Sequence, residues 1–201
     1  MAEILSDEID FSLYLRETDA RANVKPAKFW LEQLIDRLHN PEKTKRVYLP
    51  WEKSHGVFQL RPAEVTLWAG QNGHGKTQVL SQVALSLMGQ GERVCIASFE
   101  MKPRTTLERL ARMYAGTNPF SPEYQGIEGM KALDALFSEF GDWSDGRLWL
   151  YDQQGSVTAD RVIGMARYCA KELGITHVVI DSLMKCVNGE DDYNGQKDFV
   201  D

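Results

Sequence analysis

The segment from Gly70 to Thr77 carries the strongest chemical signal in the sequence, because it matches the pattern G-x-x-x-x-G-K-[ST] in full. In such a loop the backbone comes close to a phosphate, and successive N–H groups point into one concavity. Lys76 would neutralise β- and γ-phosphate charge, and the hydroxyl of Thr77 suits Mg²⁺, which prefers oxygen ligands. We therefore predict a site for ATP with Mg²⁺.

The predicted nucleotide-binding residues are those of the loop and the residue after it: Gly70, Gln71, Asn72, Gly73, His74, Gly75, Lys76, Thr77 and Gln78. We expect the three glycines to permit positive φ, and we interpret His74 as a solvent-facing position rather than a catalyst. A glycine-rich turn that merely joins a strand to a helix is the alternative. Such a turn needs no adjacent Lys-Thr pair, and phosphate binding is therefore the better interpretation.

Two carboxylates follow apolar runs and are candidates for the same site. Asp181 ends HVVID, where a strand-end carboxylate can hold Mg²⁺ together with Thr77, although a carboxylate that caps the next turn is the alternative. Glu100 ends RVCIASFE, where it could orient and deprotonate an attacking water. From the residues alone, a surface glutamate that starts the next helix is an equal interpretation of Glu100. The catalytic candidates are Glu100 and Lys76.

Strands and helices alternate from residue 64 onward. Strands are predicted at 65–69, 93–99, 147–152 and 177–181, and helices at 76–88, 105–114, 124–140 and 159–173. Gly174 suits the C′ position that ends the last of these helices. This alternation predicts an α/β fold with a parallel sheet and helices on both faces, occupying residues 56–201.

Two further regions precede this core. Residues 1–24 are acid-rich with an apolar cluster around Phe11, and are interpreted as an arm that orders only against another surface, or equally as a frayed terminus. Residues 25–55 hold an amphipathic helix at 25–39, which should stop near Pro41, and a connection. We favour an apolar stripe that covers the chain's own core over one that docks on a neighbouring subunit.

Composition limits the classes of protein. With 43% hydrophobic and 26% charged residues among 201, the chain is of the globular type, and no apolar run is long enough to span a membrane. The acidic N-terminus does not resemble a signal peptide, and three scattered cysteines indicate neither a disulfide framework nor a zinc site, so the cytoplasm is the expected compartment. The net charge of -6 means that any nucleic acid must meet a local basic surface.

Three segments carry a family resemblance: LRPAEVTLWAGQNGHGKT at 60–77, VCIASFEM at 94–101 and VVIDSL at 178–183. Together they resemble the RecA-like ATPase domain of ring helicases, the family of DnaB, the mitochondrial helicase Twinkle and phage primase-helicases. That family has a glycine where this chain has Ala63, and its Ser-Leu-Glu-Met box supplies the catalytic glutamate. The resemblance, which covers about residues 56–190, implies this role for Glu100, and the helix at 25–39 resembles the linker helix that clasps the next subunit.

The resemblance implies a homo-oligomeric ring, expected to be a hexamer, that uses ATP and Mg²⁺ to move on single-stranded DNA. In that family the core continues past the Asp181 strand with DNA-binding loops and an arginine finger. The chain is therefore expected to be the N-terminal part of a longer helicase and to hydrolyse ATP weakly alone. The alternatives are a RecA/RadA-like recombination or repair ATPase, a non-catalytic nucleotide-binding assembly module, and a small P-loop kinase. The kinase is disfavoured because Arg104, Arg109 and Arg112 follow a helical pattern rather than a lid loop.

Overall fold

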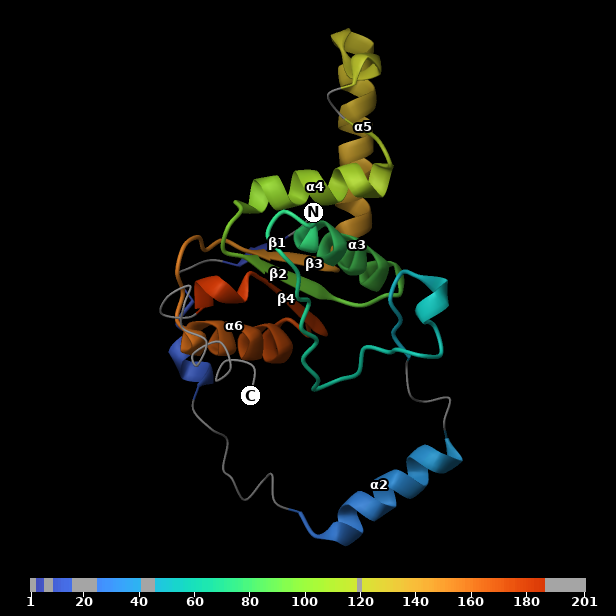
Figure 1. The fold of residues 1–201 in the computed structure, drawn as a ribbon, viewed down its shortest axis with the longest axis vertical. Helices are drawn as coiled ribbons and strands as arrows, with labels where there is room; N and C mark the ends of the chain where they lie inside the picture. The colour runs from blue at the N-terminus through green and yellow to red at the C-terminus, as the bar shows by residue number, and fades with distance from the viewer. Residues whose placement is uncertain (1–2, 6–8, 16–24, 41–45, 119–120, 187–201) are drawn as a thin grey trace.

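The computed structural model describes residues 3–5, 9–15, 25–40, 46–118 and 121–186, and at its centre lies a parallel β-sheet with helices on both faces (Figure 1). The strands are β1 (Glu3–Leu5), β2 (Val94–Ser98), β3 (Leu148–Tyr151) and β4 (His177–Asp181). The α-helices are α2 (Ala27–His39), α3 (Lys76–Gly89), α4 (Pro103–Ala115), α5 (Gly126–Ser144) and α6 (Ala159–Glu172). Short 3-10 helices occur at η1 (Phe11–Tyr14), η3 (Glu52–Ser54), η4 (Pro122–Tyr124) and η5 (Leu183–Cys186). The predicted α/β class is confirmed.

The strand order β1-β3-β2-β4 brings the carboxyl ends of β2 and β4 together. All neighbouring pairs are parallel, and the register of β2 and β4 places Ser98 opposite Asp181. Past the end of β2, the Phe99 amide still donates to the Asp181 carbonyl at 2.8 Å. Because ligands of open parallel sheets bind outside the carboxyl ends of the strands, the residues after β2 and β4 lie where a site is expected.

Two apolar clusters, one on each face of the sheet, hold the helices in place. Figure 1 shows α3, α4 and α5 on one side of the sheet and α6 on the other. Side chains alternate along β2, so Val94 and Ile96 join the cluster with α3, α4 and α5, while Cys95 and Ala97 join the cluster with α6. Every residue of β2 is buried, which is typical of a parallel strand covered on both faces. Packing on both faces of β2 therefore fixes the position of the residues that follow it.

The strand predicted at 65–69 is wrong for the structure described, since residues 64–70 carry no regular secondary structure and join no sheet. Val65 is 75% exposed and Leu67 is 62% exposed, whereas a central strand would bury both side chains. A strand is stable only where a neighbour pairs with its backbone. In the described part of the chain, β4 ends the sheet and no strand lies on its outer edge. The apolar pattern therefore indicated a strand that has no partner among these residues.

Local chemistry explains where several elements begin and end. Pro103 opens α4 before the predicted start at Thr105, because a proline in the first turn loses no helical hydrogen bond. Gly174 follows α6 with φ of 62°, the left-handed C′ conformation predicted for it. Ala63, at the position where the resembled family has glycine, also has a positive φ of 60°.

The described residues of the N-terminal arm pack on the chain's own sheet and on α6. β1 pairs with β3 at the edge of the sheet. Phe11 is buried and meets the rings of Tyr151 and Tyr168 edge-on, both at centroid distances of 5.8 Å. The Arg167 guanidinium donates to the Tyr14 carbonyl at 3.0 Å. The surface against which these residues order is therefore part of the same chain.

Gly164 on α6 permits this close packing, because a Cβ there would lie 2.6 Å from the Phe11 carbonyl oxygen. We expect Gly164→Ala to lower the free energy of unfolding by about 1–3 kcal/mol, since the methyl group must displace η1. Gly141→Ala within α5 is the matched control: its Cβ would meet nothing within 4 Å, so stability should rise by about 0.5–1 kcal/mol. Urea unfolding measures both changes, and an unchanged Gly164→Ala would contradict the docking of η1.

α2 forms the predicted amphipathic helix but does not cover the core. Every residue of the helix is exposed, and Figure 1 shows it lying apart from the sheet and the other helices. Its apolar side chains include Trp30 and Leu38, which are 52% and 69% exposed. The interpretation that this stripe covers the chain's own core is therefore wrong for the described residues. None of the helices described here combines the length and apolar character needed to cross a membrane.

Candidate functional site

The loop from Gly70 to Thr77 leads into α3, which begins at Lys76. Gly73 and Gly75 have φ of 81° and 80°, so the predicted conformational freedom is used at these two positions. Gly70 does not take a positive φ; a Cβ there would lie 3.6 Å from Cγ of Lys76, so this glycine faces the lysine stem. The first turn of α3 leaves backbone N–H groups without intrahelical acceptors, and these groups make the helix start an anion-binding site.

Lys76 spans the loop from the first turn of α3. Its Nζ donates to the carbonyl oxygens of Gly70 at 2.6 Å and Gln71 at 3.0 Å, which holds the ammonium group at the loop. Gln71 contributes through its main chain, and neither its side chain nor exposed His74 lines the adjoining cavity. Asn72, Gly73, Gly75 and Gln78 do line it.

Thr77 joins the loop to the sheet, because its Oγ1 donates to Oδ2 of Asp181 at 2.9 Å. Asp181 is buried at the end of β4. Burial raises the pKa of the Asp181 carboxyl above its ordinary value, and the nearby Glu100 carboxylate raises it further. The hydrogen bond from Thr77 and the positive charges of Arg109 and Lys76 act in the opposite direction but do not cancel the effect of burial. Ionised Asp181 would therefore be stabilised by a further cation.

The oxygen atoms of Thr77 and Asp181 fit Mg²⁺ that arrives with a nucleotide. The described residues contain no group of three or more His, Cys, Asp or Glu side chains that could hold a metal alone. Mg²⁺ is commonly held by one or two protein oxygens together with substrate phosphates and waters, and a hydroxyl beside a buried carboxylate is a donor set of this kind. When bound, the ion would neutralise phosphate charge, and Thr77 and Asp181 would hold it.

Asp181→Asn is expected to make the nucleotide-free chain more stable at pH 7. The pKa of Asp181 is higher in the folded chain than its ordinary value of 3.8. At pH values between the ordinary pKa and the raised one, the folded state therefore binds more protons than the unfolded state. Stability is therefore highest below this window and falls as pH rises through it. Asparagine cannot ionise and avoids this loss, so Tm at pH 7 should rise by on the order of 2 °C, with a smaller change at pH 4.

Thermal unfolding of wild type and Asp181→Asn at the two pH values measures this difference. The same variant should bind ATP more weakly when Mg²⁺ is present, because the carboxylate proposed to hold the ion is gone. A Tm at pH 7 below that of wild type would contradict the electrostatic cost assigned to Asp181.

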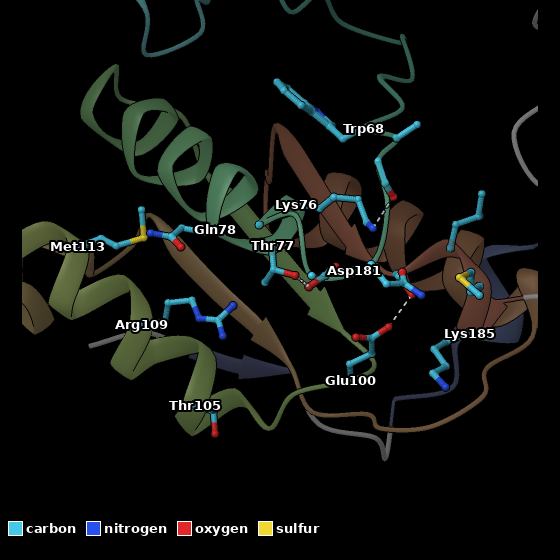
Figure 2. A pocket seen from close by; sticks show the side chains of 18 of the residues that line it. Trp68, Lys76, Thr77, Gln78, Glu100, Thr105, Arg109, Met113, Asp181 and Lys185 are labelled. Atoms are coloured by element: carbon cyan, nitrogen blue, oxygen red, sulfur yellow. Dashed lines mark hydrogen bonds between the residues drawn. The ribbon is translucent and has the colours of Figure 1, made fainter.

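Glu100 lies just past β2 and faces the phosphate loop across the cavity (Figure 2). Its side chain is exposed, and its Oε1 accepts a hydrogen bond from Ser182 Oγ at 2.8 Å. The alternative interpretation, a surface glutamate that starts the next helix, fits less well because Lys102 is the N-cap of α4 and Pro103 its first residue. A carboxylate placed here can accept a proton from a water beside a bound phosphate.

Apart from Gln71 and His74, the predicted residues converge on one cavity of about 1070 Å³, whose wall includes Lys76, Thr77, Glu100 and Asp181 (Figure 2). α4 supplies a further wall that sequence reasoning did not assign to the site. Its cavity-lining residues are Thr105, Glu108, Arg109, Arg112 and Met113. Figure 2 shows half-buried Arg109 reaching from α4 into the space beside Thr77. The three- and four-residue spacing of this set is a helical face, and this spacing could have indicated that α4 lines the site.

Proteins that pair such a phosphate-binding loop with a strand-end aspartate on a parallel sheet are P-loop nucleotide-binding proteins, and the fold and site place the chain in this class. Among known protein families, the AAA domain matches residues 52–200. Because this match spans more than half of the 201 residues, the chain belongs to the AAA domain family. Membership supports nucleotide binding and ATPase activity, the general part of the sequence prediction.

Proposed function

We propose that this AAA domain is the RecA-like motor of a ring-forming DNA helicase, which couples ATP hydrolysis to movement along single-stranded DNA. The position of Glu100 carries the proposal: it follows the strand adjacent to β4 and faces the loop of Lys76. A carboxylate there can orient and deprotonate the water that attacks the γ-phosphate, whereas a module that only binds nucleotide needs none. The likeness of Ser98–Met101 to the Glu-Met box of DnaB-type helicases supports the same role.

The exposed stripe of α2 supports assembly into a homo-oligomer. Helices of this length are marginal in water alone, and most of their stability comes from packing an apolar face on another surface. Because the described residues do not cover the stripe, the partner that we propose for it is a neighbouring copy of the chain. The family resemblance implies that these copies form a hexameric ring. With a net charge of -6, single-stranded DNA would bind a local basic surface of this cytoplasmic assembly.

The test is ATP hydrolysis by the complete product of the gene, with and without single-stranded DNA, together with the mass of the particle in Mg²⁺ and ATP. We expect hydrolysis to rise several-fold with single-stranded but not double-stranded DNA, a particle of several copies, and unwinding of a forked duplex. Nucleotide binding without turnover under every condition would contradict the proposed motor function and favour a nucleotide-binding assembly module. DNA-stimulated hydrolysis with strand exchange but no unwinding would favour a RecA/RadA-like recombination ATPase.

A further inference from the structure

Ser182 is the first residue after β4, and its hydroxyl reaches across to the residue proposed as the catalytic base. Ser182 Oγ donates to Oε1 of Glu100 at 2.8 Å (Figure 2, dashed line at Glu100). The pairing of β2 with β4, continued by the bond from Phe99 to Asp181, brings these two side chains to the same edge of the sheet. The contact joins residues that are far apart in the sequence, so it depends on the strand order.

The serine is well placed to act as a fixed donor. Its carbonyl oxygen accepts the Lys185 amide at 3.1 Å and the Cys186 thiol at 3.8 Å, so the backbone of Ser182 is tied to η5. Its side chain is half-buried, whereas that of Glu100 is exposed. A half-buried donor on an anchored backbone can therefore restrict a longer and more mobile carboxylate side chain.

The bond from Ser182 is the one hydrogen bond that Glu100 receives from any residue the structure describes. Other charges act on this carboxylate. Lys76 and Arg109 line the same cavity and attract it, whereas Asp181 repels it. Without the serine, Glu100 could turn toward either cation or toward solvent. With it, one carboxylate oxygen is engaged, and the other stays available to accept a proton from water.

We infer that Ser182 is a positioning residue, which holds the Glu100 carboxylate in the orientation that ATP hydrolysis requires. This inference rests on the proposed function, because it assigns to Ser182 a part in the same hydrolysis. Ser182 does not take up the proton itself, and its hydroxyl donates to Glu100. Its effect on turnover passes through Glu100.

The test compares Ser182→Ala, Ser182→Thr and wild type in steady-state ATP hydrolysis by the complete gene product. A hydrogen bond to a charged group is lost in Ser182→Ala, so kcat should fall about tenfold while KM for ATP changes less than about twofold. Ser182→Thr keeps the hydroxyl and should recover most of kcat. Ser156→Ala, a serine in an exposed loop outside the cavity, is the matched control and should behave as wild type.

A double-mutant cycle separates positioning from a general structural effect. In a Glu100→Gln background, Ser182→Ala should cause little further loss, because the group it positions is already disabled. An unchanged kcat in Ser182→Ala, equal losses with and without Glu100, or a failure of threonine to recover activity would each overturn the inference while leaving the proposed function intact. A wild-type protein that binds ATP but never hydrolyses it would overturn the proposed function and this inference together.

Discussion

Lys76→Ala is expected to raise the Kd for ATP with Mg²⁺ by about 100-fold or more. The Lys76 ammonium is held at the phosphate loop by the carbonyls of Gly70 and Gln71, so it is already in place when a triphosphate arrives. Truncating one member of a charged pair costs several kcal/mol, and each 1.4 kcal/mol is about tenfold in Kd. Isothermal titration of the 201-residue chain with ATP and Mg²⁺ measures the change.

Lys171→Ala provides the matched control for charge. Lys171 is exposed on α6 and does not line the cavity, so its removal changes net charge equally without touching the loop. Its Kd should stay near that of wild type, and thermal unfolding of both variants checks that each is folded. If folded Lys76→Ala binds ATP with wild-type affinity, the loop is not the phosphate site.

The parts of the site that could be predicted from sequence are those whose chemistry is contiguous. The phosphate loop lies within one short segment, so residue types and spacing were sufficient to place Lys76 and Thr77 together. Asp181 ends one apolar strand and Glu100 follows another, and parallel strands end at a common edge. Their convergence on one cavity therefore followed from the α/β alternation without knowledge of the strand order.

Features that depend on strand order or on distant packing were not predictable. The contact between Ser182 and Glu100 requires β4 to lie beside β2, which no local pattern reveals. The docking of Phe11 on α6 depends on the absence of a Cβ at Gly164, a residue far from Phe11 in the sequence. Residues 65–69 have strong β-propensity but no partner in the described chain, so propensity alone misled.

The amphipathic pattern of α2 predicted the helix but not its packing partner. Periodicity predicted the helix correctly because it depends on local spacing, but it could not identify the surface that the apolar stripe contacts. The same ambiguity affected α4. Its helical pattern was recognised, but the sequence did not show that Arg109 lines the cavity. For both helices the sequence predicted the element, and the fold was needed to place its partner.

Glu100→Gln is expected to leave ATP binding nearly unchanged and to lower kcat by about 10²–10⁴-fold. Glutamine keeps the size of the side chain and can still accept the hydrogen bond from Ser182, but it cannot take a proton from water. A positioned general base contributes about 10²–10⁴-fold to a rate, which sets the expected loss. Steady-state hydrolysis by the complete gene product measures kcat, and titration with ATP and Mg²⁺ measures binding.

Glu108→Gln is the control that makes this result specific to Glu100. Glu108 lines the same cavity from α4 and undergoes the same change of charge, but it lies near Arg112, with 4.0 Å between Oε1 and Nη1. If loss of negative charge in the cavity were enough to slow hydrolysis, both variants would be impaired equally. We expect Glu108→Gln to keep most of kcat, since Glu108 belongs to α4, whereas Glu100 follows the strand beside β4 and faces the phosphate loop. Normal turnover by Glu100→Gln would show that another group activates the water, and the motor proposal would lose the observation on which it depends.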